Sequence, residues 1–247
     1  MMRGCLDFQG GIVELPGRFR IGYSYEPTGS APALWNPAAT QSPFALTLLY
    51  GASGAGKTKL MEALWEYLTA EREEQHSSMF THSDKPQPRR FAGYVSQGAL
   101  IVNHWKASEI VPQESPFFRV LLEQDTDMGK HMGEFSGGQQ KRIYICSMLE
   151  YLIQSAKACP ALSNQEACYA LLDETLDGLG ADGASQCVLA IKQAWESKNS
   201  IPPLYMLVVT HLSEAELALQ SIEAKRIKLS ISQTTNPETL PVRVEVL

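Results

Sequence analysis

Short apolar runs alternate with amphipathic segments along much of this chain. Ala45–Tyr50 (Ala-Leu-Thr-Leu-Leu-Tyr) has the length and composition of a buried strand, and Leu60, Leu64 and Leu68 then recur at the spacing of one helix face. Further strands are expected over Phe91–Gln97, Tyr169–Asp173 and Leu204–Val209. Strands that alternate with helices predict an α/β fold around a mainly parallel sheet. We expect a single domain over residues 1–247.

The N-terminal part has a different pattern. Residues 11–25 are expected to form antiparallel strands, and the Pro/Ala/Gly/Ser-rich residues 27–43 are expected to form a loop. Residues 73–90 are predicted to form a surface loop, and Val242–Leu247 one more strand. The sequence therefore predicts an antiparallel N-terminal β-layer beside the parallel core.

A complete phosphate-binding motif lies between the first buried strand and the first helix. Residues 51–58 read Gly-Ala-Ser-Gly-Ala-Gly-Lys-Thr. In this context the backbone N–H groups of the loop and the helix N-terminus bind phosphates, the lysine reaches the β- and γ-phosphates, and the threonine hydroxyl ligates Mg²⁺. The sequence therefore predicts ATP and Mg²⁺ as ligands, with these ATP-binding residues: Gly51, Ala52, Ser53, Gly54, Ala55, Gly56, Lys57 and Thr58.

Composition limits the class of protein. With 247 residues and 44% hydrophobic content, the chain is large enough for a real core. The sequence contains no stretch of about 18 apolar residues that could span a membrane. The five cysteines show no paired spacing, so we expect reduced thiols in a cytoplasmic protein. The net charge of −6 does not indicate broad affinity for nucleic acid.

Four further motifs follow the phosphate-binding loop in a fixed order. They are a strand ending at Gln97, the run Glu-Phe-Ser-Gly-Gly-Gln-Gln-Lys-Arg over Glu134–Arg142, the run Tyr-Ala-Leu-Leu-Asp-Glu over Tyr169–Glu174, and Val-Val-Thr-His over Val208–His211. From about residue 45 to residue 230, the chain resembles an ATP-binding cassette (ABC) ATPase. This resemblance implies a P-loop NTPase core with a helical subdomain, here expected over about residues 98–150.

The resemblance implies a role for each motif. Asp173 would hold Mg²⁺ through water, together with Thr58 and Gln97, and Glu174 would polarise the attacking water as general base. His211 would steady the γ-phosphate and Glu174. The implied catalytic residues are Lys57, Gln97, Glu174 and His211. Phosphoryl transfer leaves little covalent chemistry to the protein, so these groups position reactants and stabilise charge.

The run around Ser136 resembles the family's signature motif, with Phe135 in the place of the usual leucine. In the family, this helix start binds the γ-phosphate of the nucleotide held by the other subunit. The residues expected to do so are Ser136, Gly137, Gly138 and Gln139. The resemblance therefore implies a dimer with two composite sites, formed by two copies of the chain or by two different ABC domains.

Some positions depart from the family pattern. In the simplest gapless alignment, Gly180 replaces the aspartate that ends the D-loop, which normally couples the two composite sites. Asp177 is then the nearby carboxylate, and Thr175 stands where transporters commonly have proline. An aromatic residue stacks on adenine in the family, and Tyr23 and Tyr25 are the candidates for that role.

Two biological roles fit these motifs. The Gly-Gly-Gln-Gln-Lys-Arg signature and the residues after Gln97 favour the nucleotide-binding subunit of a transporter whose membrane-spanning subunits are separate chains. That subunit would lie in the cytoplasm, peripheral on the inner face of the membrane. The run Gly-Lys-Thr-Lys-Leu-Met-Glu-Ala-Leu and the short helical subdomain favour instead a soluble ABC ATPase acting as a switch in DNA maintenance, repair or defence against phage.

Overall fold

The computed structural model describes most of the chain, including all the expected motifs. The described residues are 6–8, 11–14, 20–25, 33–35, 42–70, 80–82, 90–97, 102–122, 126–158, 167–197, 201–211, 224–232 and 239–246. Its strands in the main sheet are β2 (Gly11–Glu14), β3 (Arg20–Tyr25), β5 (Phe44–Gly51), β7 (Arg90–Val95), β8 (Ala167–Asp173), β9 (Leu204–Val209), β10 (Ala224–Ile231) and β11 (Thr239–Val246).

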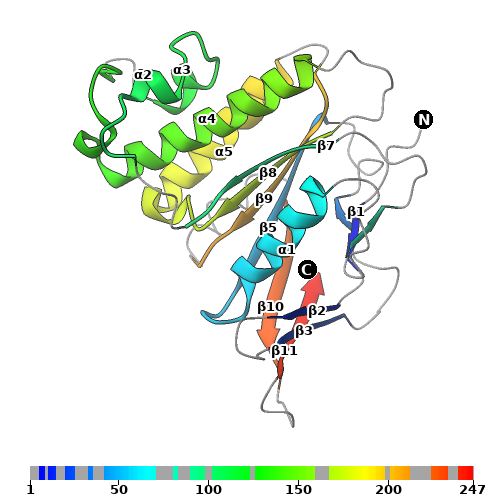
Figure 1. Cartoon of the computed structure of the whole chain (residues 1–247). Coiled ribbons are helices and arrows are strands. Elements are labelled where there is room, and N and C mark those ends of the chain that lie inside the picture. Colours follow the sequence, from blue (N-terminus) through cyan, green and yellow to red (C-terminus); the bar gives the residue numbers. More distant parts are fainter. Residues whose placement is uncertain are drawn as a thin grey trace.

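The main sheet has eight strands in the order β2-β3-β11-β10-β5-β9-β8-β7 (Figure 1). All neighbours from β10 to β7 run parallel, whereas β2 with β3 and β10 with β11 are antiparallel. The expected mainly parallel α/β sheet with an antiparallel N-terminal edge is therefore confirmed. Because β5, β7, β8 and β9 are parallel neighbours, their carboxyl ends meet at one edge, where ligands bind in open α/β sheets.

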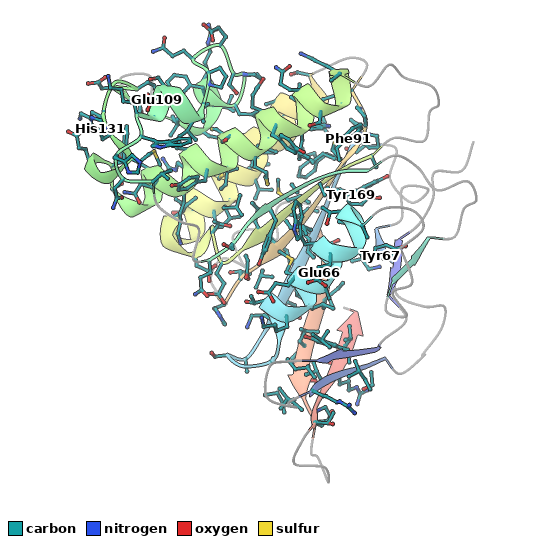
Figure 2. All side chains as sticks on the ribbon, viewed as in Figure 1. Glu66, Tyr67, Phe91, Glu109, His131 and Tyr169 are labelled. Atoms are coloured by element: carbon teal, nitrogen blue, oxygen red, sulfur yellow. The ribbon has the colours of Figure 1, made fainter. Side chains whose placement is uncertain are left out.

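Helices cover both faces of this sheet (Figure 1). Helix α1 (Lys57–Thr69) lies on one face, and α4 (Gly137–Ala158) and α5 (Gly180–Glu196) lie on the other. The strands between them are buried on both sides, with alternate residues in the two cores: Leu48 packs with the α4 and α5 layer, and Leu49 packs with the α1 layer. Figure 2 shows Tyr67 of α1 and Tyr169 of β8, which belong to the α1 layer.

The expected helix face of α1 is the buried one. Leu60, Leu64 and Leu68 are at most 4% exposed and pack against the sheet. Burying three leucines in this way contributes about 1.5–3 kcal/mol for each side chain. This packing fixes the helix behind the phosphate-binding loop, so the loop sits on a rigid support.

In its described residues, the expected helical subdomain contains little regular structure before α4. Helices α2 (Ala107–Ile110) and α3 (Phe118–Leu121) have four residues each, and a 3₁₀ turn spans Met132–Glu134. They are held against the α4 and α5 layer by buried side chains, and the ring of Phe117 stacks on that of Trp195 with centroids 6.1 Å apart. The segment is compact and anchored to the core despite its short helices.

Two segments expected to be loops contain short strands. β4 (Ala33–Trp35) lies within residues 27–43, and β6 (Phe80–His82) lies within residues 73–90. Both pair with β1 (Leu6–Phe8) in a small antiparallel sheet, so those two expectations were wrong at these residues. Three-residue strands carry too little periodicity to be seen in the sequence, and long-range pairing decides them. The described helices include none that is both long and apolar enough to cross a membrane.

Candidate nucleotide-binding site

The predicted phosphate-binding loop joins β5 to α1, and the first residue of α1 is Lys57. Gly56 caps the helix with φ at 79°, in the left-handed region that glycine adopts without strain. The hydroxyl of Tyr23 donates a hydrogen bond to the Gly56 carbonyl at 2.7 Å. A Cβ at position 56 would lie only 2.7 Å from that hydroxyl. The loop conformation and its contact with β3 therefore both require glycine here.

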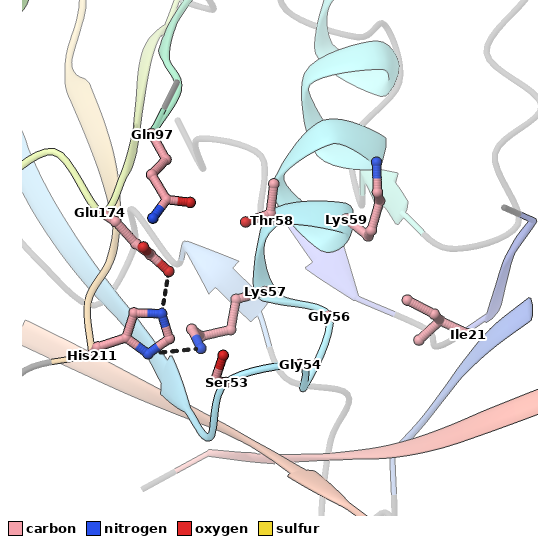
Figure 3. Close-up of a pocket in the computed structure, with 10 residues that line it drawn as sticks. All are labelled: Ile21, Ser53, Gly54, Gly56, Lys57, Thr58, Lys59, Gln97, Glu174 and His211. Carbon is pink, nitrogen blue, oxygen red and sulfur yellow. Dashed lines mark hydrogen bonds and ion pairs between the residues drawn. The ribbon is translucent and has the colours of Figure 1, made fainter. Parts of the chain in front are cut away.

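The loop opens into a pocket of about 330 Å³ (Figure 3). The pocket is lined by Ile21, Ser53, Gly54, Gly56, Lys57, Thr58, Lys59, Gln97, Glu174 and His211. Every residue expected to be catalytic is in this set, although they come from four different parts of the chain. Of the other loop residues, Gly51 and Ala52 accept hydrogen bonds from Lys57 through their carbonyls, and Ala55 is fully buried.

The Lys57 side chain is held at the centre of the site. Its Nζ donates to the carbonyls of Gly51 at 2.9 Å and Ala52 at 3.0 Å, and it lies 3.3 Å from Nδ1 of His211. His211 in turn pairs through Nε2 with Oε1 of Glu174 (Figure 3). Burial lowers the pKa of Lys57, and the carboxylates of Glu174, Asp173 and Asp177 oppose that shift. The ammonium group thus lies among carbonyl and carboxylate groups, and a phosphate could take their place as its partner.

Glu174 has an unusual backbone. Its φ of 52° makes it the one non-glycine residue with positive φ in the part of the chain that is described. Its N–H donates to the Val209 carbonyl at 3.0 Å, which ties the turn after β8 to the end of β9. Such conformations are sparsely populated and persist only where surrounding contacts fix them. The strained turn directs the carboxylate toward His211 and the pocket.

Asp173 lies directly behind the pocket at the end of β8 and is fully buried. Thr58 and Tyr94 hydrogen-bond to its carboxylate, the latter at 3.3 Å to Oδ2, yet Oδ1 has no hydrogen-bond partner among the described residues. Burial raises the pKa of Asp173, and the neighbouring Glu174 adds to the effect. An unpaired buried carboxylate oxygen beside a threonine hydroxyl fits a site for Mg²⁺, which prefers oxygen ligands and keeps several waters.

The run around Ser136 forms the N-terminus of α4. Ser136 and Gln139 make a reciprocal capping box, in which each side chain accepts a hydrogen bond from the other's backbone N–H, at 3.3 and 3.0 Å. Gln140 donates to the carbonyls of Met132 and Phe135 and so fixes the preceding turn. Ser136 and Gly137 are exposed, and none of Ser136, Gly137, Gly138 and Gln139 lines the pocket of this chain. The helix start is therefore presented to solvent.

Residues 36–152 match the family model described as ABC transporter. The match covers the phosphate-binding loop, Gln97 and the run around Ser136. The resemblance to an ATP-binding cassette ATPase is therefore confirmed over these residues. Among solved structures, it is similar to the crystal structure of an SMC head bound to the C-winged helix domain of ScpA, with a TM-score of 0.48, 11% identity and 98% of each chain covered. No curated protein matches the chain.

The loop after Glu174 departs from the family pattern in its sequence, and its backbone at Gly180 favours glycine. Gly180 begins α5 with φ at 69° and ψ at 171°, a combination that is essentially limited to glycine. An aspartate at this position would be strained. The position of the usual D-loop aspartate is therefore occupied by a turn that demands glycine.

Asp177, considered above as the nearby carboxylate, is an anchor for the histidine loop. Its Oδ1 accepts a hydrogen bond from the Thr210 hydroxyl at 2.7 Å, and its Oδ2 accepts one from the His211 N–H at 3.1 Å. Both oxygens are therefore engaged by the segment that carries His211. This role left no signal in the sequence, because it depends on a contact between residues far apart in the chain.

The two tyrosines suggested for adenine stacking have different outcomes. The Tyr23 side chain is 4% exposed and packs under the loop, so its ring is not available to a base in the pocket. The side chain of Tyr25 lies outside the described part of the chain. Ile21 of the same strand lines the pocket instead and supplies an aliphatic surface near Gly56. Sequence reasoning missed Ile21 because an isoleucine in a strand gives no functional signal.

Proposed function

We propose that this ABC domain binds Mg-ATP in the pocket around Lys57 and hydrolyses it when a second ABC domain supplies the α4 N-terminus. One observation carries the proposal: Lys57, Gln97, Glu174 and His211 converge on a single pocket at the carboxyl edge of the parallel sheet. Asp173 and Thr58 supply oxygen ligands for Mg²⁺ beside it. The metal would neutralise charge on the phosphates.

In this mechanism, the residues of the chain mainly position the reactants. Lys57 binds the β- and γ-phosphates once it leaves the carbonyls of Gly51 and Ala52. Glu174 lies at 9% exposure with its carboxylate facing the pocket, where it accepts the proton of the attacking water. His211 orients that carboxylate through Nε2, and Gln97 reaches in from the end of β7.

Assembly follows from the position of the α4 N-terminus. Ser136 and Gly137 are exposed and do not line the pocket of their own chain, so in this proposal they contact a nucleotide bound by a second domain. The free N–H groups of a helix start bind anions, which suits them to a γ-phosphate. We therefore propose two nucleotides sandwiched between two ABC domains.

Dilution tests this assembly. The specific ATPase activity is expected to fall as the protein is diluted, because only the dimer contains complete sites. Glu174→Gln is expected to elute as a dimer with Mg-ATP, whereas the double variant Lys57→Ala, Glu174→Gln is expected to remain monomeric. Flat specific activity over a wide dilution range, together with a monomeric Glu174→Gln variant, would contradict a self-sufficient homodimer.

As the biological role of this ATP hydrolysis, we first propose that the chain is the nucleotide-binding subunit of a transporter. The Gly-Gly-Gln-Gln-Lys-Arg run supports this role. The segment between Gln97 and α4 also exposes Trp105 at 47% and Val120 at 45%, which offers apolar contacts to a membrane-spanning partner. A multi-span membrane protein encoded by a neighbouring gene should bind the chain and stimulate its ATPase activity.

The second candidate is a switch ATPase in DNA maintenance or defence against phage. It is favoured by the small size of the segment before α4, whose two helices have four residues each. The run Gly-Lys-Thr-Lys-Leu-Met-Glu-Ala-Leu at the start of α1 resembles that branch of the family. A nuclease or DNA-binding protein as the neighbouring partner, with no effect of the membrane protein, would favour this role.

A further inference from the structure

A lysine of α4 contacts the backbone of the strained glutamate in the same chain. Lys141 lies in the second turn of α4, and its Nζ donates to the Glu174 carbonyl at 3.3 Å. Lys141 is not part of the phosphate-binding loop and does not line the pocket. Lys141 therefore connects α4 to Glu174. The start of α4 is proposed to bind the partner's nucleotide, and Glu174 is proposed as the general base for the chain's own nucleotide.

Packing holds the two segments together at this point. A Cβ on Gly178 would lie 3.1 Å from Nζ of Lys141 and 3.6 Å from its Cδ and Cε, so the lysine side chain runs along the backbone of the turn. On the other side, a Cβ on Gly138 would lie 3.4 Å from Leu179 and 3.7 Å from the Gly178 carbonyl. Close contact between the helix start and the turn leaves little room for either to move alone.

The hydrogen bond from Lys141 helps to fix the backbone of Glu174. Glu174 keeps its φ of 52° only if its surroundings fix it, and its N–H is already bound to the Val209 carbonyl. Lys141 binds the other end of the same residue, because its charged Nζ donates to the Glu174 carbonyl. Loss of the bond leaves the carbonyl free to turn and relaxes the orientation of the carboxylate.

We propose that Lys141 is a positioning residue that couples the two composite sites. Docking of α4 on the partner's nucleotide would move Lys141 and thereby set the backbone of Glu174 at the chain's own nucleotide. This link would do the work of the D-loop aspartate, whose position is held by Gly180. The inference rests on the proposed ATPase function.

Variants at position 141 test the link directly. Lys141→Met keeps the aliphatic packing along Gly178 and removes the donor, and Lys141→Arg restores a donor. We expect Lys141→Met to lower kcat about tenfold with unchanged ATP affinity in a binding titration, and Lys141→Arg to recover most of the rate. Lys157→Met is the matched control, because it makes the same change at an exposed position of the same helix and should leave kcat unaltered.

Cooperativity separates coupling from a merely structural role. The rate of the parent protein should depend sigmoidally on ATP concentration, and Lys141→Met should make that dependence hyperbolic. Gly178→Ala should have the same effect by displacing the lysine, with little further loss in the double variant. If Lys141→Met or Gly178→Ala folds and hydrolyses ATP with the parental kcat and cooperativity, the inference is overturned. A parent that neither binds nor hydrolyses ATP would overturn the proposed function instead.

Discussion

Nζ of Lys57 lies 3.3 Å from Nδ1 of His211, so the first residue of α1 and the histidine after β9 form a direct hydrogen bond. An ammonium group has no acceptor, and therefore Nδ1 must accept and Nε2 must carry the ring proton when the ring is neutral. Nε2 then donates to Glu174. The hydrogen bonds from Lys57 through His211 to Glu174 therefore link the group that would bind the γ-phosphate to the carboxylate that would activate water.

Lys57→Ala is expected to lower ATP affinity at least about 100-fold, because the charged hydrogen bonds to the β- and γ-phosphates are lost. A titration with a fluorescent ATP analogue measures the change. Lys59→Ala is the matched control: Lys59 also lines the pocket, but it is 41% exposed and pairs with Glu62 one turn along α1. Its loss should weaken binding only a few-fold. Parental affinity in Lys57→Ala would exclude the pocket as the phosphate site.

Glu174→Gln is expected to bind Mg-ATP normally while the hydrolysis rate falls by about 10²-fold or more, because the amide cannot accept the proton from water. A phosphate-release assay and a binding titration separate the two effects.

Asp177→Asn provides the comparison for that variant. It removes a carboxylate of the same turn but keeps an acceptor oxygen for Thr210 or the His211 N–H, so it should retain far more activity. If Glu174→Gln instead keeps activity near the parental rate, the general base lies elsewhere, and Asp177 is the next candidate.

The sequence located the pocket because its residues stand where strands end. Gln97, Asp173 and His211 each follow a short apolar run, and in a parallel sheet such runs deliver their last residues to one edge. The phosphate-binding loop was also predictable, since its glycines and lysine are adjacent in the chain. The strand ends placed these residues at one edge of the sheet, and the resemblance of the motif order to that of an ATP-binding cassette ATPase indicated their roles.

Contacts between distant segments were not predictable in this way. Tyr23 under Gly56, Asp177 on the His211 loop and Lys141 on Glu174 join segments that are far apart in sequence or in different elements. Lys141 lies in the run Glu134–Arg142, and Tyr23 and Asp177 drew attention for other reasons, but nothing in the sequence indicates these contacts. The left-handed backbone of Glu174 could not be predicted from the sequence either, because tertiary contacts impose it on a residue other than glycine.

Asp173→Asn is expected to stabilise the ligand-free protein. Burial first, and then Glu174, raise the pKa of Asp173 in the folded state, so the folded protein pays a penalty for the ionised carboxylate. A raised folded pKa gives stability that is present at low pH and is lost as the pH rises through the folded pKa. At neutral pH the variant should therefore melt at a higher temperature than the parent protein.

The gain from Asp173→Asn should shrink as the pH is lowered toward the ordinary range of aspartate, about 4. Thermal melts at neutral and acidic pH measure it, with Asp182→Asn at an exposed position of α5 as the control that should give no gain. Added Mg-ATP should raise the melting temperature of the parent more than that of the variant, which lacks the charged ligand for Mg²⁺. A lower melting temperature for Asp173→Asn at neutral pH would contradict the penalty.

Gly180→Asp places the usual D-loop residue in this chain, and it is expected to impair the protein. With φ at 69° and ψ at 171°, the position is strained for any residue with a Cβ, at a cost of about 1–3 kcal/mol. The melting temperature should fall by about 2–10 °C, and ATPase activity should not rise. Gln186→Asp adds the same carboxylate to an exposed position of the same helix and should change both quantities little. An active Gly180→Asp protein with parental stability would mean that the turn readily adopts another conformation, and it would leave the usual aspartate free to couple the two sites.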